Sequence, residues 1–410
     1  DVTLHAGESV NLSAKINFQK DGKNVVTTIE KKVNWESSNF DVATIDANGK
    51  VTAVKGGTAI ITAECQGTKE TCAISVKDIF VAGSLELSDS EKLAVIWQKC
   101  DTGAFVKYSL ENAEFTAMEV NELGIYYAGI ENGTAKVWKD ETILNELGEN
   151  ITVTSMCIAN GNVYVSGYES ISDKFVARVW KDGSEILNFN SDITTYAYDV
   201  LVEKGKVYVA GAKFREKTAL DLYDAIIWVD GVETPLEKPA GLGNETAQAK
   251  SICINKGAIY VGGSVDEGSN EKPYIWKDGE SCFDFKTDKG SVKNIKFMNN
   301  VLYAFYGTTL LMGDVKSNST DMMSIMIQAK GDGYIDAIES LGSVYVVAQG
   351  YPQYANGKTD EIESGYNKTA LATILLKDNG MVDFLPRSMR ANGDGEPEYP
   401  RSNAVAIGIR

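Results

Sequence analysis

The segments Val207-Tyr208-Val209-Ala210-Gly211 and Trp228-Val229-Asp230-Gly231 form one copy of the repeat that decides the fold of most of this chain. The first segment has the composition of a short β-strand, and the Asp-Gly pair of the second is typical of a tight turn between strands. Copies of the first segment recur through residues 78–410, with their aromatic residues 38 to 52 positions apart. These aromatic residues are Phe80, Tyr126, Tyr164, Tyr208, Tyr260, Tyr303 and Tyr345.

The second segment follows each copy of the first, and its tryptophan gives way to Met312 and Leu376 in the last two copies. Seven repeats of about forty residues, each with four short strands, predict a seven-bladed β-propeller. Regular spacing places the tryptophans in the blade cores and the aspartates in turns. The repeats begin with a second strand at 79–83, and residues 403–407 have the pattern of a first strand. We therefore expect the C-terminal strand to complete the first blade and close the ring.

This repeat resembles that of exported bacterial propeller proteins, which carry Tyr-Val-Ala-Gly followed by Trp-Lys-Asp-Gly, as at Trp180-Lys181-Asp182-Gly183. The resemblance implies a propeller and an exported protein, and it transfers no catalytic residues. The Asp-box of sialidases and the Trp-Asp signature of WD repeats are both missing from the sequence.

Residues 1–77 form a separate unit, whose landmarks are the segments 7–12, 33–39, 42–46, 49–55 and 57–63. The unit resembles, over its whole length, the bacterial immunoglobulin-like domain of group 2. That resemblance implies a small β-sandwich of exported and surface proteins, often used as a spacer or in adhesins. Trp35 is expected to fill the inter-sheet core, and Asn48-Gly49 to form a hairpin turn. The predicted fold class is therefore all-β, with a sandwich over 1–77 and a propeller over 78–410.

Charge and composition exclude several classes of function. Residues 1–77 hold nine lysines and nine acidic residues, so the net charge of −17 lies entirely in residues 78–410. Such a surface repels nucleic acid. No run of eighteen apolar residues predicts a transmembrane helix. The single histidine, His5, lies in the small unit, which removes Ser-His-Asp and Cys-His catalysis from the large one.

The six cysteines show no metal-binding pair spacing. Cys65 and Cys72 flank a short turn, so a disulfide across that hairpin is geometrically possible in an exported protein. Short strands leave the register open, and free thiols are the alternative. Cys157 and Cys253 stand within apolar strands and are expected to be core residues.

The connections predict where a ligand site lies. Turns between the first and second strands and between the third and fourth strands are short, so the long connections gather on one face, the long-loop face. The residue nine positions before each repeated aromatic residue is expected to be the first residue of the first strand. Together these residues are expected to surround the mouth of the central channel on the long-loop face. Such residues either satisfy backbone groups or contact a ligand. They are Ala117, Ser155, Asp199, Ser251, Asn294 and Asp336, with Asn403 in the closing strand.

Two further groups belong to this face. In the segment 349–369, Tyr351, Tyr354 and Tyr366 could stack on sugars or peptides, and Asp360, Glu361 and Glu363 could bind calcium, unless the loop is simply solvated. In the last connection, Arg387, Arg390 and Arg401 lie near Tyr399 and could form an anion pocket or clamp the ring closure. Asp394 is another calcium candidate, although its segment lacks full EF-hand spacing.

We expect an exported, non-catalytic binding protein at the bacterial cell surface or in the periplasm, which recognises a glycan or a surface protein through the long-loop face. The alternative is a carbohydrate-active hydrolase or lyase that uses Asp, Glu, Tyr or Arg without histidine; Asp199 and Asp336 stand too far around the ring to act as a pair. A structural stalk is a third reading. We expect a monomer, no cofactor beyond calcium, and a lipid anchor, if any, upstream of Asp1.

Overall fold

The computed structural model shows an all-β chain, and the described residues contain strands and no helix. Among them there is accordingly no helix that could cross a membrane. The described residues are 1–14, 17–20, 23–26, 33–88, 91–100, 103–189, 192–217, 221–238, 246–267, 270–284, 290–298, 300–306, 309–313, 323–325, 333–340, 343–350, 372–377, 380–384, 390–391, 397–398 and 401–410.

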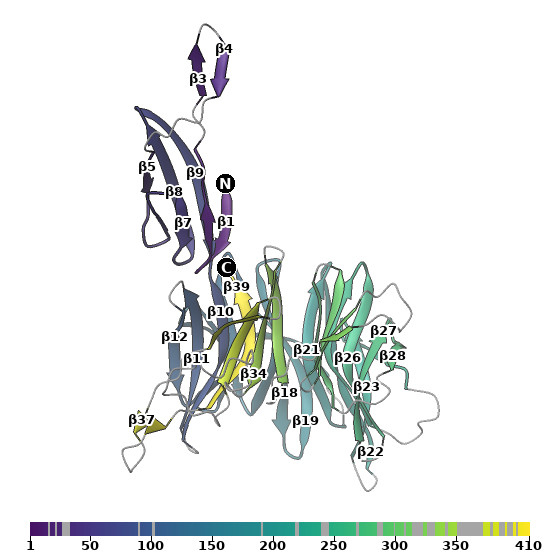
Figure 1. Ribbon diagram of the computed structural model, residues 1–410. Helices are drawn as coiled ribbons and strands as arrows, with labels where there is room; N and C mark the ends of the chain where they lie inside the picture. The colour runs from purple at the N-terminus through teal and green to yellow at the C-terminus, as the bar shows by residue number, and fades with distance from the viewer. Residues whose placement is uncertain are drawn as a thin grey trace. The chain divides into compact units, whose positions relative to one another are not determined.

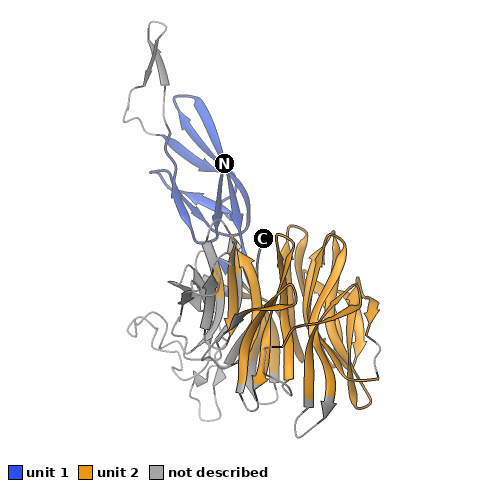
Figure 2. Ribbon diagram, turned by 90° about the vertical axis from the view of Figure 1, so that its right-hand side faces the viewer, with its two compact units in different colours: residues 1–80, 98–105, 409–410 blue, residues 81–97, 106–408 orange. Residues whose placement is uncertain are grey.

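The chain divides into two compact units (Figure 2). The first contains residues 1–80, 98–105 and 409–410, and the second contains residues 81–97 and 106–408.

The N-terminal unit packs a four-stranded sheet, β1-β9-β8-β5, and a three-stranded sheet, β2-β7-β6, around one core. Val51, Ile61 and Ile74 are fully buried in that core, while Trp35 packs against it only half-buried, so it does not fill the core as predicted. The turn at Gly49 (φ +82°) is confirmed. The strands are β1 (Val2–His5), β2 (Ser9–Asn11), β3 (Asn17–Lys20), β4 (Lys23–Val26), β5 (Asn34–Ser37), β6 (Ala43–Ile45), β7 (Lys50–Ala53), β8 (Gly57–Cys65) and β9 (Thr68–Lys77).

The possible disulfide between Cys65 and Cys72 is absent, because both cysteines are free. Strands β8 and β9 are joined by the two-residue turn Gln66-Gly67, which pairs Cys65 with Thr68 and Cys72 with Ile61. The two thiols therefore do not face each other across the hairpin.

Residues 79–409 form seven four-stranded sheets in the described part of the chain, which we number 1 to 7 (Figure 1). In spatial order, sheet 1 is β39 (Arg401–Ile409), β10 (Ile79–Ser88), β11 (Glu91–Cys100) and β12 (Gly103–Glu111). Sheet 2 is β13 (Ala113–Asn121), β14 (Gly124–Glu131), β15 (Thr134–Lys139) and β16 (Thr142–Glu149). Sheet 3 is β17 (Ile151–Ala159), β18 (Asn162–Ile171), β19 (Lys174–Lys181) and β20 (Ser184–Asn188). Sheet 4 is β21 (Thr195–Glu203), β22 (Lys206–Lys217), β23 (Asp221–Val229) and β24 (Val232–Pro235).

The remaining sheets keep the same order. Sheet 5 is β25 (Thr246–Asn255), β26 (Ala258–Glu267), β27 (Asn270–Lys277) and β28 (Glu280–Asp284). Sheet 6 is β29 (Val292–Met298), β30 (Val301–Tyr306), β31 (Thr309–Gly313) and β32 (Met323–Ile325). Sheet 7 is β33 (Gly333–Ser340), β34 (Ser343–Gly350), β35 (Ala372–Lys377) and β36 (Gly380–Phe384), and β37 (Arg390–Ala391) pairs with β38 (Pro397–Glu398).

The expected pairing of the C-terminal strand is confirmed, since β39 lies beside β10 and takes the first position of sheet 1. One predicted connection is wrong. In sheet 6 the third strand ends at Gly313 and the fourth begins at Met323, so the two strands are not joined by the short turn that was predicted.

The repeated tryptophans and aspartates have the structural roles that their spacing predicts. The five tryptophans of the sheets are at most 4% exposed. Asp182 shows the turn chemistry: its φ is +49°, and its Oδ1 accepts a hydrogen bond from the backbone N–H of Val163 at 2.8 Å. Asp140, Asp230 and Asp278 make the equivalent bond, which fastens the third strand's end to the start of the second.

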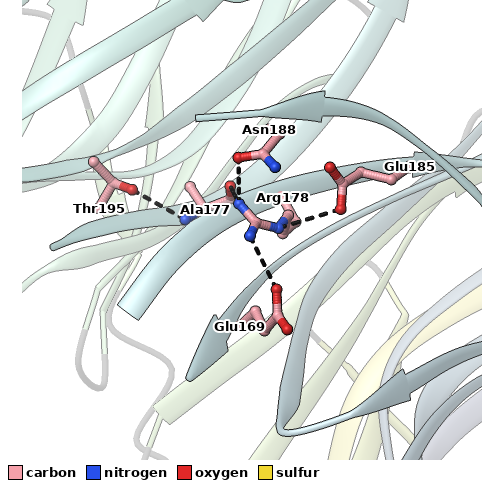
Figure 3. A network of polar contacts seen from close by, with 6 residues as sticks. All are labelled: Glu169, Ala177, Arg178, Glu185, Asn188 and Thr195. Carbon is pink, nitrogen blue, oxygen red and sulfur yellow. Dashed lines mark hydrogen bonds and ion pairs between the residues drawn. The ribbon is translucent and has the colours of Figure 1, made fainter. Parts of the chain in front are cut away.

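Arg178 on β19 holds sheet 3 together through buried polar contacts (Figure 3). Its side chain faces Gly167 on the neighbouring strand, where no side chain competes for the space. The guanidinium donates to Asn188 Oδ1 at 2.6 Å and to Glu169 Oε2 at 3.0 Å, and its Nε lies 3.3 Å from Glu185 Oε2. Lys136 takes the same position in sheet 2, opposite Gly129, between Glu131 and Glu146.

Substituting Arg178 with leucine should lower the free energy of unfolding by about 2 kcal/mol, because three charge-assisted contacts of a 5% exposed side chain are lost. The carboxylates of Glu169 and Glu185 are 35% and 40% exposed, so water solvates them after the change and limits the cost. Urea unfolding followed by tryptophan fluorescence measures the effect. Arg178→Lys keeps the positive charge but replaces the planar guanidinium with a single ammonium group. It should lower the free energy of unfolding by about half as much. A loss below 0.5 kcal/mol for the leucine variant would contradict this role.

Candidate functional site

A β-bulge interrupts the first strand of each of sheets 2 to 7. The register shifts between Ala197 and Asp199 in β21, for example, so that Tyr198 is an extra residue with no partner on β22. A bulge bends its strand and re-aims the side chains around it. The extra residues are Thr116, Thr154, Tyr198, Lys250, Lys293 and Ile335, and we call them the bulge residues.

A glycine on the second strand faces the bulge in sheets 2 to 5, and it explains why the repeat segment ends in glycine. A Cβ on Gly211 would lie 1.9 Å from the backbone oxygen of Tyr196 and 2.6 Å from the ring of Trp228. Gly129, Gly167 and Gly263 meet the equivalent carbonyl at 1.9 to 2.2 Å. The glycine thus lets the two backbones approach closely where the bulge forms.

The first strands of sheets 2 to 7 and β39 surround a cavity of about 800 Å³. In β13, β17, β21, β25 and β29 the lining begins at the bulge residue and continues toward the tight turn at the end of the strand. Each of these strands follows a connection of the long-loop face, so the bulge residues mark the end of the cavity nearer that face.

The residues predicted to ring the channel mouth lie directly after the bulges. Ala117, Ser155, Asp199, Ser251 and Asn294 all line the cavity. They are not the first residues of their strands, although this was predicted. Four of the strands begin four or more residues earlier, and β29 begins two residues earlier. Asp336 holds the same position in β33, and Asn403 lies in β39, but the structure describes only their backbones.

Asp199 is the centre of the polar contacts inside the cavity. Its Oδ1 accepts hydrogen bonds from Ser155 Oγ at 2.6 Å and from the N–H of Val200 at 2.9 Å. Its Oδ2 accepts from Ser251 Oγ and from the N–H of Ile252, both at 2.9 Å. Burial raises the pKa of Asp199, and these four bonds oppose that rise. Both oxygens are occupied, so the carboxylate links sheets 3, 4 and 5.

Two further bonds extend this chain of contacts around the cavity. The N–H of Ile295 in sheet 6 donates to Ser251 Oγ at 3.2 Å. Thr154 in sheet 3 donates its hydroxyl to the backbone oxygen of Ala197 in sheet 4 at 2.9 Å. Four consecutive sheets are therefore joined by hydrogen bonds at their innermost strands.

The two cysteines of the cavity wall are not activated nucleophiles. Burial is the main cause that raises the pKa of Cys157 to about 12, with the charges of Glu119 and Asp199 adding to it. Burial likewise raises the pKa of Cys253. Both thiols remain protonated at neutral pH. The two residues pack against core clusters but are only half-buried, so they are not the fully buried core residues that were predicted.

Sequence reasoning missed the bulge residues themselves, above all Tyr198, Lys250 and Lys293. In a regular strand each would point away from the side occupied by Asp199, Ser251 and Asn294, and only the bulge turns it into the cavity wall. The Lys250 ammonium lies 3.5 Å from the centroid of the Tyr198 ring. The Tyr198 hydroxyl donates to Gln248 Oε1 at 3.3 Å.

Tyr198 is one end of a band of six half-exposed aromatic residues. Tyr196 stacks on Tyr198, with ring centroids 5.7 Å apart, and contacts Tyr168, Phe175 and Tyr223 at 5.0 to 5.8 Å. Phe214 packs on Tyr223 at 5.7 Å and completes the aromatic band. Phe175 is 37% exposed, in contrast to the buried tryptophans.

The other predicted site residues lie where little is described. Tyr351, Tyr354, Asp360, Glu361, Glu363, Tyr366, Arg387, Asp394 and Tyr399 are outside the described residues. Arg390 lies in β37 and Arg401 in β39, with only their backbones described. The described part of the chain holds no group of three His, Cys, Asp or Glu side chains that could bind a metal ion.

We expect the Lys250 ammonium to lose its proton near pH 8. Burial lowers its pKa to about 8, with a small contribution from Lys293, and Glu271 opposes this shift. Carbon-13 NMR of reductively methylated lysines should show one resonance that titrates far below the others and that Lys250→Arg removes. Because the folded state disfavours the charged form, raising the pH from about 8 to 10.5 should stabilise the wild type relative to Lys250→Met. A Lys250 midpoint above pH 10 would contradict this environment.

Residues 1–74 match the family model of the bacterial Ig-like domain (group 2). The match accounts for the N-terminal β-sandwich, as the resemblance of its sequence predicted. No curated protein matches the chain.

Solved structures resemble the chain at low identity. A computationally designed protein, Ika8, is 12% identical, with a TM-score of 0.41 over 78% of this chain and 96% of that one. The β-propeller domain of the Trilobed protease from Pyrococcus furiosus is 14% identical, with a TM-score of 0.40 over 80% and 92%. A thermostable family-43 glycoside hydrolase is 8% identical, with a TM-score of 0.34 over 71% and 96%. Likenesses this distant carry no argument about activity.

Proposed function

We propose that this chain is a non-catalytic binding protein that recognises a glycan or a protein through the long-loop face of its propeller. The observation that carries the proposal is the set of side chains at that end of the cavity. Tyr198, Lys250 and Lys293 come from three consecutive sheets and line its wall, and the aromatic band continues from Tyr198. Aromatic and cationic groups at the mouth of a rigid cavity are typical of ligand recognition.

The hydrogen bonds of Asp199 support binding over catalysis. A general acid or a nucleophile needs a free oxygen that faces the substrate. Both oxygens of Asp199 already accept two hydrogen bonds each from sheets 3, 4 and 5. A carbohydrate-active hydrolase or lyase is the alternative function, and its test is the release of products.

Several finer features belong to the same proposal. The domain boundary lies between residues 77 and 78, the seven sheets close into one seven-bladed ring, and the Ig-like domain acts as a spacer on an exported surface protein. The one metal ion in this proposal is calcium, bound by Asp360, Glu361, Glu363 or Asp394. The proposed ligand contacts beyond those described are Asp336, Tyr351, Tyr354, Tyr366, Arg387, Arg390, Tyr399, Arg401 and Asn403.

The first experiment incubates the full chain, with and without calcium, with a panel of host and plant polysaccharides and measures retention and released products together. Retention without products supports the binding protein. New reducing ends or unsaturated sugars would support the enzyme instead. Tyr196→Ala should weaken retention, whereas Phe40→Ala, an equally aromatic change at a 57% exposed site of the other unit, should not.

A further inference from the structure

We propose that the cavity mouth formed by Tyr198, Lys250 and Lys293, together with the aromatic band, binds an anionic saccharide, with a sugar ring on the aromatic faces and its carboxylate or sulfate on the lysines. The inference rests on the proposed function and names its ligand class.

The two lysines carry positive charges that no described carboxylate pairs with directly. Neither Lys250 nor Lys293 forms an ion pair within the described part of the chain, whereas Lys136 in sheet 2 and Lys213 in sheet 4 each pair with glutamate. Glu271 on β27 and Lys293 on β29 are the charged groups that act on Lys250, and the Tyr198 ring lies against it. Because Lys250 is half-buried, an anion that enters the mouth meets a poorly hydrated ammonium, which strengthens their attraction.

The aromatic band supplies the second half of the recognition. Its six rings come from β18, β19, β21, β22 and β23, so the band spans sheets 3 and 4 and reaches the cavity through Tyr198. Each residue is only partly buried, so ring surface is left for a ligand. The C–H faces of sugars pack on aromatic rings, and a cation beside the rings selects a sugar that carries an anionic group.

The charge of the whole chain shapes the choice of probe. The net charge of −17 repels a long acidic polymer at a distance. A short oligosaccharide carries fewer charges and reaches the lysines with less repulsion. We therefore specify three trisaccharide probes: trigalacturonate for carboxylates, sulfated galactotriose for sulfates, and neutral galactotriose.

The test is isothermal titration calorimetry of the full chain with each probe at pH 7. We expect at least one acidic probe to bind at least tenfold more tightly than galactotriose, and the better acidic probe identifies the anionic group. Lys250→Gln should weaken that binding at least tenfold. Lys256→Gln is the matched control, because Lys256 is an exposed lysine in the turn at the opposite end of the inner strand. Thermal melting checks that each variant is folded.

Other results would overturn the inference. Equal affinity for galactotriose, or a Lys250→Gln effect below twofold, would show that charge does not select the ligand. If galactotriose binds at least as tightly as both acidic probes and Tyr196→Ala abolishes its binding, the anionic ligand is wrong while the proposed binding function stands. Binding of none of the three probes overturns the anionic-saccharide site, and the polysaccharide panel then decides the proposed function separately.

Discussion

Replacing Gly211 with alanine should lower the free energy of unfolding by about 3 kcal/mol or more. The new Cβ would lie 1.9 Å from the backbone oxygen of Tyr196 and 2.6 Å from the Trp228 ring, and neither can move without disturbing its sheet. Strands β21 and β22 would have to separate at the bulge. Urea unfolding followed by the fluorescence of the buried tryptophans measures the loss.

Gly205→Ala is the matched control. Gly205 has a φ of +80°, but no atom lies within 4 Å of its Cβ position. Alanine at this position should lower the free energy of unfolding only by the strain of a positive φ, about 1 kcal/mol. A Gly211→Ala loss no larger than the Gly205→Ala loss would show that the close approach at the bulge is relaxed easily.

A second variant separates the two contacts of Gly211. In sheets 6 and 7, Tyr306 and Ala348 take the glycine's place opposite the bulge. Leu311 and Leu376 hold the register position of the tryptophan, so the sequence-based choice of Met312 is wrong by one residue. The glycine and the tryptophan are thus lost together within this chain. We expect Trp228→Leu and Gly211→Ala to cost at least 1 kcal/mol less together than the sum of the single changes. Additive losses would mean that the carbonyl contact alone excludes a side chain.

The second large effect concerns Asp199. We expect Asp199→Ala to lower the free energy of unfolding by about 3 kcal/mol, because the N–H groups of Val200 and Ile252 lose their acceptor in a half-buried site. The hydroxyls of Ser155 and Ser251 also lose theirs, although they can rotate toward water. The same unfolding experiment measures this loss.

Asp182→Ala is the control for Asp199→Ala. It tests whether the loss of stability comes from the hydrogen-bond network of Asp199 or follows the removal of any aspartate. Asp182 is exposed and accepts a side-chain hydrogen bond from one backbone group, so its loss should cost no more than about 1 kcal/mol. Asp199→Asn should fall between the two, because an amide retains one acceptor oxygen. Equal losses for the two alanine variants would contradict the role of Asp199 in linking the sheets.

Much of the fold follows from the sequence because the repeat has a period. The Asp-Gly turns and the buried tryptophans follow from spacing alone, as Asp182 and Trp276 show. Strand pairing at the ends was also predictable, since a first strand was missing at residue 79 and present near residue 403.

The candidate site was predictable only in part. The positions of Asp199 and Ser251 follow from the count back from the repeated aromatic residue, but their place in mid-strand does not. A bulge depends on the packing of two backbones, and no single residue type marks it. Lys250 and Tyr198 were missed for that reason. A glycine repeated opposite the same strand position is the signal that could have found them.

The place of β39 beside β10 has a consequence for synthesis on the ribosome. Strand β10 ends at Ser88 and its neighbour begins only at Arg401. At 5 to 20 residues per second, roughly 15 to 60 seconds separate the emergence of the two strands. During that interval one edge of β10 has no partner and can pair with other nascent chains. Newly made protein should therefore depend on chaperones until β39 is released, even though the sheets between β10 and β39 can form in order as they emerge.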